Sequence, residues 1–182
     1  MGICSRGFTR VLVPFFAVFI TFTAGCTENR QSPKNIIVMI SDGCGYYHVD
    51  AAGIYEHGTA GRQPYEQFPL VCGMSTYMAD GSYEPEVIWN DFDSAKEGYT
   101  DSAAAGTAMS TAVKTYKGAI GVDTDKKPVK HLIQHCEQLG MATGVITSVP
   151  FNHATPAAHV AHNESRDNYK ELAREMIYKS GC

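Results

Sequence analysis

The sequence predicts an α/β fold with a largely parallel sheet flanked by helices. A continuous apolar, β-branched run at residues 35–40 has the composition of a strand buried on both faces. Further along the chain, strand-like segments alternate with segments that have helical periodicity. The 182 residues, 44% of them hydrophobic, suit one ordinary domain rather than a disordered chain or a multi-span membrane protein.

The first predicted strand, residues 35–40, ends abruptly at Ser41-Asp42-Gly43-Cys44-Gly45. Asp42 is therefore expected just past the carboxyl end of this strand. Open α/β sheets bind their ligands at the carboxyl ends of their strands, which makes Asp42 a candidate site residue. The segment 70–78 is a second strand candidate. The polar, acidic segment 89–98 is expected to form a loop.

A helix is predicted over residues 102–114, because this segment is rich in alanine, the strongest helix former. Thr100-Asp101-Ser102 supplies the N-cap chemistry before it. A serine at a helix N-terminus lies beside free backbone N–H groups and the positive end of the helix dipole. Both features stabilise an alkoxide and a bound phosphate. On these residues alone, a plain capping serine is the simpler interpretation.

Two more helices and a third strand follow. Residues 128–139 form an apolar helical face that begins at a proline and stops before a glycine. Residues 144–149 are the third predicted strand, so the segment 151–155 after it should share the carboxyl edge of the sheet with Asp42. The last predicted helix covers residues 166–179.

Several chemistries are disfavoured. The formal net charge is −4 and no Lys/Arg cluster is present, which argues against a nucleic-acid partner. His131 and His135 are four residues apart but lack the glutamate of a zinc-protease motif, so we interpret them as an exposed helix face. The cysteines contain no C-x-x-C pair, which argues against a zinc finger and against a thioredoxin-like motif. The pairing of Cys44, Cys72, Cys136 and Cys182 stays open.

The N-terminal segment has the pattern of a targeting signal. Arg6 and Arg10 form a positive region, and the apolar stretch 11–23 that follows is shorter than the ~20 residues that a membrane span needs. Residues 1–25 are therefore predicted to be a signal peptide that directs the protein to export.

Thr23-Ala24-Gly25-Cys26 resembles a bacterial lipobox, whose cysteine becomes the lipidated first residue of the mature protein. Thr23 departs from the leucine usual in that motif. The prediction is an anchor on Cys26, a tether over residues 26–34, and a location in the periplasm or cell envelope. Ordinary secretory cleavage and an uncleaved anchor are the alternatives.

Several segments, taken together, resemble the alkaline phosphatase family. They are residues 35–45, 100–107, 110–116, 118–123, 153–158, 161–162 and 165–166. They occur in the family's order over nearly the whole chain, so the domain is placed at residues 35–182. The resemblance implies a phosphate-monoester hydrolase that acts on small substrates with zinc and magnesium, and it leaves a homodimer open.

The resemblance also implies roles for individual residues. Ser102 matches the nucleophile that forms a phosphoserine intermediate. Arg166 matches the guanidinium that clamps the phosphate, for which its planar fork of donors is suited. Asp101 is expected to position Arg166. These three residues form the predicted catalytic and substrate-binding set.

The predicted metal ligands are Asp42, Thr155 and His153. Asp42 matches a carboxylate shared by one zinc ion and the magnesium ion, and Thr155 matches a hydroxyl ligand of magnesium. Some family members have a carboxylate at the position of His153 and others a histidine. Because imidazole prefers zinc, His153 is expected to act through water or to shift the metal preference. His159 and His162 receive no role from the resemblance and are interpreted as structural.

In the family, most zinc ligands come from the later half of the enzyme, and this sequence ends at Cys182 before that part. A catalytic zinc usually has three protein ligands, and only Asp42 is available here. We therefore expect a domain incomplete at its C-terminus and inactive alone. The alternatives are a non-catalytic envelope lipoprotein that retains a phosphate-binding remnant and, less favoured, a phosphodiesterase or sulfatase relative.

Overall fold

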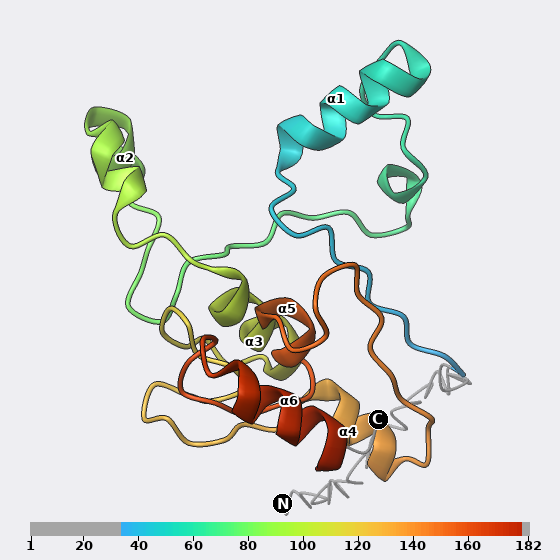
Figure 1. Cartoon of the computed structure of the whole chain (residues 1–182). Helices are drawn as coiled ribbons and strands as arrows, with labels where there is room; N and C mark the ends of the chain where they lie inside the picture. Colours follow the sequence, from blue (N-terminus) through green and yellow to red (C-terminus); the bar gives the residue numbers. More distant parts are fainter. Residues whose placement is uncertain (1–33, 180–182) are drawn as a thin grey trace, which may run out of the picture. The chain divides into compact units, whose positions relative to one another are not determined.

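A computed structural model of the chain describes residues 34–179 (Figure 1). The predicted signal peptide, Cys26 and nearly all of the predicted tether lie outside these residues. Contacts divide the described residues into two units, with the boundary between Met39 and Ile40. Within residues 34–179, no helix is both long and apolar enough to span a membrane.

The described elements are helices and short 3-10 turns. In chain order they are α1 (Tyr46–His57), η1 (Pro64–Gln67), α2 (Pro85–Asn90), η2 (Phe92–Lys96), α3 (Ser102–Thr111), α4 (Leu132–Gln138), α5 (Ala154–Ala157) and α6 (Tyr169–Tyr178).

The predicted sheet is not formed among the described residues. They contain no β-strand and only two isolated antiparallel bridges, which join Ile120 to Asn163 and Val122 to Pro128. The three predicted strands, residues 35–40, 70–78 and 144–149, have no regular secondary structure. A strand requires a neighbour that exchanges ladder hydrogen bonds with it, and the residues described here supply none. Most of the apolar side chains of these segments are accordingly exposed.

Helix α3 confirms the predicted alanine-rich helix and its cap. The Asp101 carboxylate accepts a hydrogen bond from the backbone N–H of Ala104 at 3.0 Å. The helix ends earlier than predicted, because Ala112 adopts a left-handed conformation with φ of 61° and its N–H binds Ala108 O. The element that carries Ser102 is therefore a ten-residue helix with a carboxylate at its N-terminus.

The predicted loop at residues 89–98 is wrong. The segment is largely helical, since it holds the end of α2 and all of η2, whose first turn is capped by the Asp91 side chain.

The helix predicted to begin at Pro128 begins four residues later, as α4. Pro128 and Val129 lie outside the helix, because Pro128 bridges to Val122 and Val129 N binds Gly121 O.

Helix α6 is also shorter than predicted, and Arg166 lies in the loop before it. The Arg166 N–H binds Gly118 O at 2.7 Å rather than entering a helical ladder. Leu172 is fully buried and Met176 packs against the core, whereas Tyr169 and Ile177 are exposed. Only one side of α6 therefore faces the core.

Small side chains dominate the core. Its buried members are Ala103, Ile120, Ala154, Ala157, Ala158, Ala161 and Leu172. Helix α3 packs against α5 and α4 (Figure 1). A Cβ atom at Gly106 would lie 2.9 Å from the Cβ of Ala158, so α3 and α5 can approach this closely only because position 106 is glycine. Cys44, Cys72 and Cys136 are free thiols, and Cys182 lies outside the described residues.

Candidate active site

The N-terminus of α3 places Ser102 as the first helical residue, half-buried, directly after the capping Asp101. The residues that follow it are small and buried, among them Ala103 and Gly106. Ser102 thus lies where unpaired backbone N–H groups and the helix dipole favour a nearby anion.

The predicted contact between Asp101 and Arg166 is present. Arg166 Nη1 donates to Asp101 Oδ2 at 3.0 Å, and the two side chains are 24% and 10% exposed, respectively. Gly118 joins them, because its N–H donates to Asp101 Oδ1 at 3.2 Å and its carbonyl accepts from the Arg166 N–H. One carboxylate therefore holds the helix N-terminus, the Gly118 loop and the guanidinium together.

The surroundings of Asp101 keep it ionised. Burial acts to raise the pKa of this carboxyl group, but the Ala104 N–H, the Arg166 guanidinium and the Gly118 N–H together hold the pKa below its ordinary value of 3.8. Asp101 is therefore an anion at neutral pH, as its ion pair with Arg166 requires.

Asp42 and Thr155, predicted as metal ligands from distant parts of the sequence, lie in contact. The Thr155 hydroxyl donates to Asp42 Oδ2 at 2.7 Å. This hydrogen bond lowers the pKa of Asp42, with further contributions from the Ser102 hydroxyl and from the charge of Arg166 that outweigh the opposing effect of burial. Asp42, Thr155 and Ser102 thus form one group near the Arg166 charge.

His153 precedes α5 as its N-cap residue. Its ring stacks on that of Tyr169, with centroids 6.4 Å apart and an angle of 21° between the planes. It is only two residues from Thr155, but its ring contact is with Tyr169. The prediction of His153 as a metal ligand remains a prediction.

The interpretation of His131 as part of an exposed helix face is wrong, although His135 is exposed as predicted. His131 is the N-cap residue of α4 and is fully buried. Its ring lies 3.2 Å from Ser110 Oγ and 3.0 Å from Ala161 O. Burial and the neighbouring His162 lower the pKa of His131 to about 4, so it is neutral at neutral pH.

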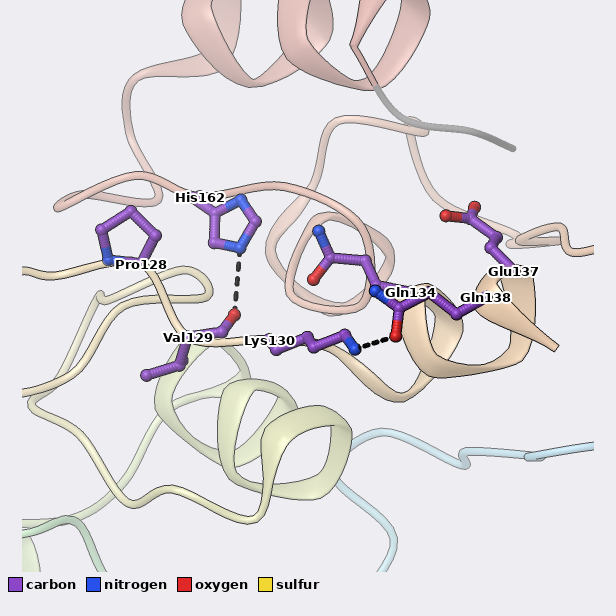
Figure 2. A pocket seen from close by; sticks show the side chains of 7 residues that line it. All are labelled: Pro128, Val129, Lys130, Gln134, Glu137, Gln138 and His162. Atoms are coloured by element: carbon purple, nitrogen blue, oxygen red, sulfur yellow. Dashed lines mark hydrogen bonds between the residues drawn. The ribbon is translucent and has the colours of Figure 1, made fainter.

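Sequence reasoning did not predict the contacts of two further residues, Gly118 and His162. Gly118 acts only through its backbone, which no side-chain pattern reveals, although it lies in a segment that carries the family resemblance. His162 contacts Glu175 and Val129 and lines an open hollow of about 580 Å³ together with Lys130 and Gln134 (Figure 2). The family resemblance gave His162 no role, and no local sequence pattern predicts its contacts with Glu175 and Val129.

The described residues include no cluster of three or more His, Cys, Asp or Glu side chains that could hold a metal ion. The Asp42 carboxylate and the Thr155 hydroxyl nevertheless place two oxygen atoms side by side, and magnesium prefers oxygen ligands. This pair fits part of a magnesium site.

A serine at a helix N-terminus, two carboxylates and a partly buried guanidinium lie in one region of the described residues, and helix N-termini and guanidinium groups are chemically suited to bind anions. Residues 33–182 match the family model described as alkaline phosphatase. The chain therefore belongs to the alkaline phosphatase family.

Individual relatives agree. Alkaline phosphatase 4 of Bacillus subtilis is 39% identical over 154 residues, which cover 82% of this chain and 30% of that protein. The cold-active enzyme of a psychrophilic Shewanella species is 36% identical with a TM-score of 0.60, over 76% of this chain and 32% of that one. A histidine-to-aspartate mutant of the TAB5 enzyme from an Antarctic bacterium, described with Mg bound in its M3 site, is 31% identical with a TM-score of 0.64, over 82% and 37%.

The chain therefore has an alkaline-phosphatase-like fold. It spans about 30% of the length of alkaline phosphatase 4 of Bacillus subtilis.

Proposed function

We propose that this chain supplies the nucleophile and the phosphate clamp of a phosphomonoesterase. The observation that carries the proposal is the set of contacts around Asp101, which ties the N-terminus of α3 to the Arg166 guanidinium. Ser102 stands at that N-terminus, so a phosphate that meets the serine would also meet the guanidinium. Family membership supports the same reaction class.

In the proposed reaction, Ser102 Oγ forms a bond to phosphorus while the bond from phosphorus to the ester oxygen breaks and the alcohol leaves. Water then attacks the phosphoserine and releases inorganic phosphate, which regenerates the serine. Arg166 donates hydrogen bonds to the phosphate oxygens, and the backbone N–H groups at the start of α3 add partial positive charge. Asp101 keeps the guanidinium oriented throughout.

We propose Asp42, Thr155 and His153 as the residues of this chain that would hold magnesium, with Asp42 shared with zinc. Bound metal ions would supply charge stabilisation to the transferring phosphoryl group. The low pKa of Asp42 supports this assignment, because a ligand carboxylate must be ionised. The 182-residue chain assayed alone is expected to be inactive, since Asp42 is the one zinc ligand we propose in it.

We also propose small phosphate monoesters as substrates and an exported protein tethered to the membrane through Cys26. In a bacterium supplied with labelled fatty acid, the protein should take up label and partition with membranes. Cys26→Ser should abolish the labelling. An unlabelled, soluble product would contradict the tether and leave the phosphatase proposal intact.

A chimera tests the catalytic proposal. Residues 35–182 would replace the matching segment of Bacillus subtilis alkaline phosphatase 4, and hydrolysis of an aryl phosphate would be measured with zinc and magnesium supplied. Turnover that is lost on Ser102→Ala and kept on Ser82→Ala, an exposed loop serine, supports the proposal. A folded chimera that binds phosphate without turnover would favour the non-catalytic alternative.

A further inference from the structure

The ring of His162 lies between two groups that can only accept hydrogen bonds. Its Nδ1 is 2.9 Å from Glu175 Oε1, and its Nε2 is 3.0 Å from Val129 O, a contact drawn in Figure 2. A carboxylate and a backbone carbonyl are both hydrogen-bond acceptors. The His162 ring is therefore held from both sides, by α6 and by the segment before α4.

The ring of His131 lies beside that of His162, with ring centroids 4.6 Å apart at an angle of 41°. His131 is fully buried, and its Nε2 donates to Ala161 O while Ser110 supplies the contact at Nδ1. Burial and the neighbouring His162 lower the pKa of His131 to about 4. The buried His131 ring thus forms one wall of the space that holds His162.

His162 joins three segments of the chain. Through Nε2 it holds the segment around Val129, and through Nδ1 it holds Glu175 on α6. Glu175 Oε1 also accepts from the His162 backbone N–H at 3.1 Å. The His162 side chain is therefore a junction between α6, the segment before α4 and the start of the loop that carries Arg166.

That loop is short and fixed at both ends. Immediately after His162, Asn163 exchanges two backbone hydrogen bonds with Ile120, at 2.9 and 2.7 Å. At the other end, the Arg166 N–H binds Gly118 O at 2.7 Å. A displacement of the His162 end would shift the backbone from which the Arg166 side chain reaches Asp101.

We propose that His162, held between Glu175 and Val129, is a positioning residue that fixes the 162–166 loop and thereby the Arg166 guanidinium. The inference rests on the proposed function of Arg166 as the phosphate clamp. His162 itself does not touch the phosphate. It acts through the geometry of Arg166.

A double-mutant cycle tests this inference in the metal-loaded chimera, with inorganic phosphate as the probe. His162→Gln is expected to weaken phosphate binding by on the order of 10- to 100-fold, the usual result of a small misplacement of a binding group. In an Arg166→Ala background, the same substitution should change phosphate affinity little further, because its effect passes through Arg166. His135→Gln, on the exposed histidine of α4, is the matched control and should leave affinity unchanged.

Each other outcome is decisive. Equal losses in both backgrounds would mean that His162 acts on the fold as a whole, which would overturn the inference alone. Phosphate affinity that does not respond to Arg166→Ala would overturn both the inference and the proposed function of Arg166.

If His162→Gln fails to fold, the cycle is run with Glu175→Gln, which keeps an acceptor oxygen but removes the carboxylate that contacts Nδ1 of His162. The same outcomes then support or overturn the inference.

Discussion

The Asp101 carboxylate binds the Arg166 guanidinium at 3.0 Å and, with its other oxygen, caps the helix that begins at Ser102. A single side chain thus fixes the relative positions of the proposed nucleophile and the proposed phosphate clamp. The contact joins residues 65 positions apart in the sequence. Stability and the proposed phosphate recognition should therefore be coupled at Asp101.

Stability should depend on the ionisation of Asp101. Because its folded-state pKa lies below 3.8, the ionised form stabilises the fold above that pH, and this contribution is lost as the pH falls through the folded-state value. Asp101→Ala should also lose the helix cap, at a cost of about 0.5–2 kcal/mol at neutral pH. Denaturant unfolding across pH measures both effects. A variant with the same stability and the same acid sensitivity as the wild type would contradict this prediction.

Arg166→Ala should weaken the binding of inorganic phosphate by about 1.5–3 kcal/mol, the range for hydrogen bonds that involve a charged group. In the active chimera it should reduce catalysis without abolishing it. Inhibition of aryl phosphate hydrolysis by phosphate measures the change. Arg174→Ala, on the exposed side of α6, is the matched control. Phosphate inhibition that is unchanged by Arg166→Ala would remove Arg166 from the site.

His153→Asp should tighten magnesium binding, because it replaces an imidazole by a hard, anionic oxygen ligand. After treatment of the chimera with a chelator, activity should return at a lower magnesium concentration than in the unsubstituted chimera. The magnesium dependence of Tyr169→Leu is the comparison, since this variant keeps His153 but removes the ring on which it stacks. A magnesium dependence identical to that of the unsubstituted chimera would show that position 153 does not face the metal.

Gly121→Ala should destabilise the fold strongly. A Cβ atom there would lie 2.2 Å from Ala161 O and 2.7 Å from the His131 ring. Overpacking of this kind costs about 1–3 kcal/mol, and the left-handed φ of 60° adds to it. Gly58→Ala is the matched control, because its φ is 75° but nothing lies within 4 Å of the added atom. Equal losses of unfolding free energy in the two variants would contradict the packing argument.

What could be predicted from the sequence was local or carried by the family resemblance. The alanine-rich helix and its cap at Asp101 depend on neighbouring residues, and the structure contains both. The contact between Asp101 and Arg166 followed from the resemblance, because no local pattern links residues so far apart. The grouping of Asp42 with Thr155 was predicted both by the resemblance and by their places after two predicted strands, although the described residues do not form those strands.

The predictions failed where tertiary contacts decide. The apolar run at residues 35–40 has the composition of a strand, but pairing depends on a neighbour that the described residues do not provide. His131 is buried because Ser110 and Ala161 enclose its ring, which its spacing from His135 could not reveal. Gly118 contributes backbone groups alone. Such contacts leave no side-chain pattern in the sequence.

The most direct test of the proposed chemistry is to trap the covalent intermediate. The active chimera would be mixed with phosphate-labelled substrate, quenched in acid during turnover, digested and mapped. The label is expected on the peptide that contains Ser102, and it should be absent after Ser102→Ala. Label on a histidine, or turnover with no labelled peptide, would contradict the assignment of Ser102 as the nucleophile.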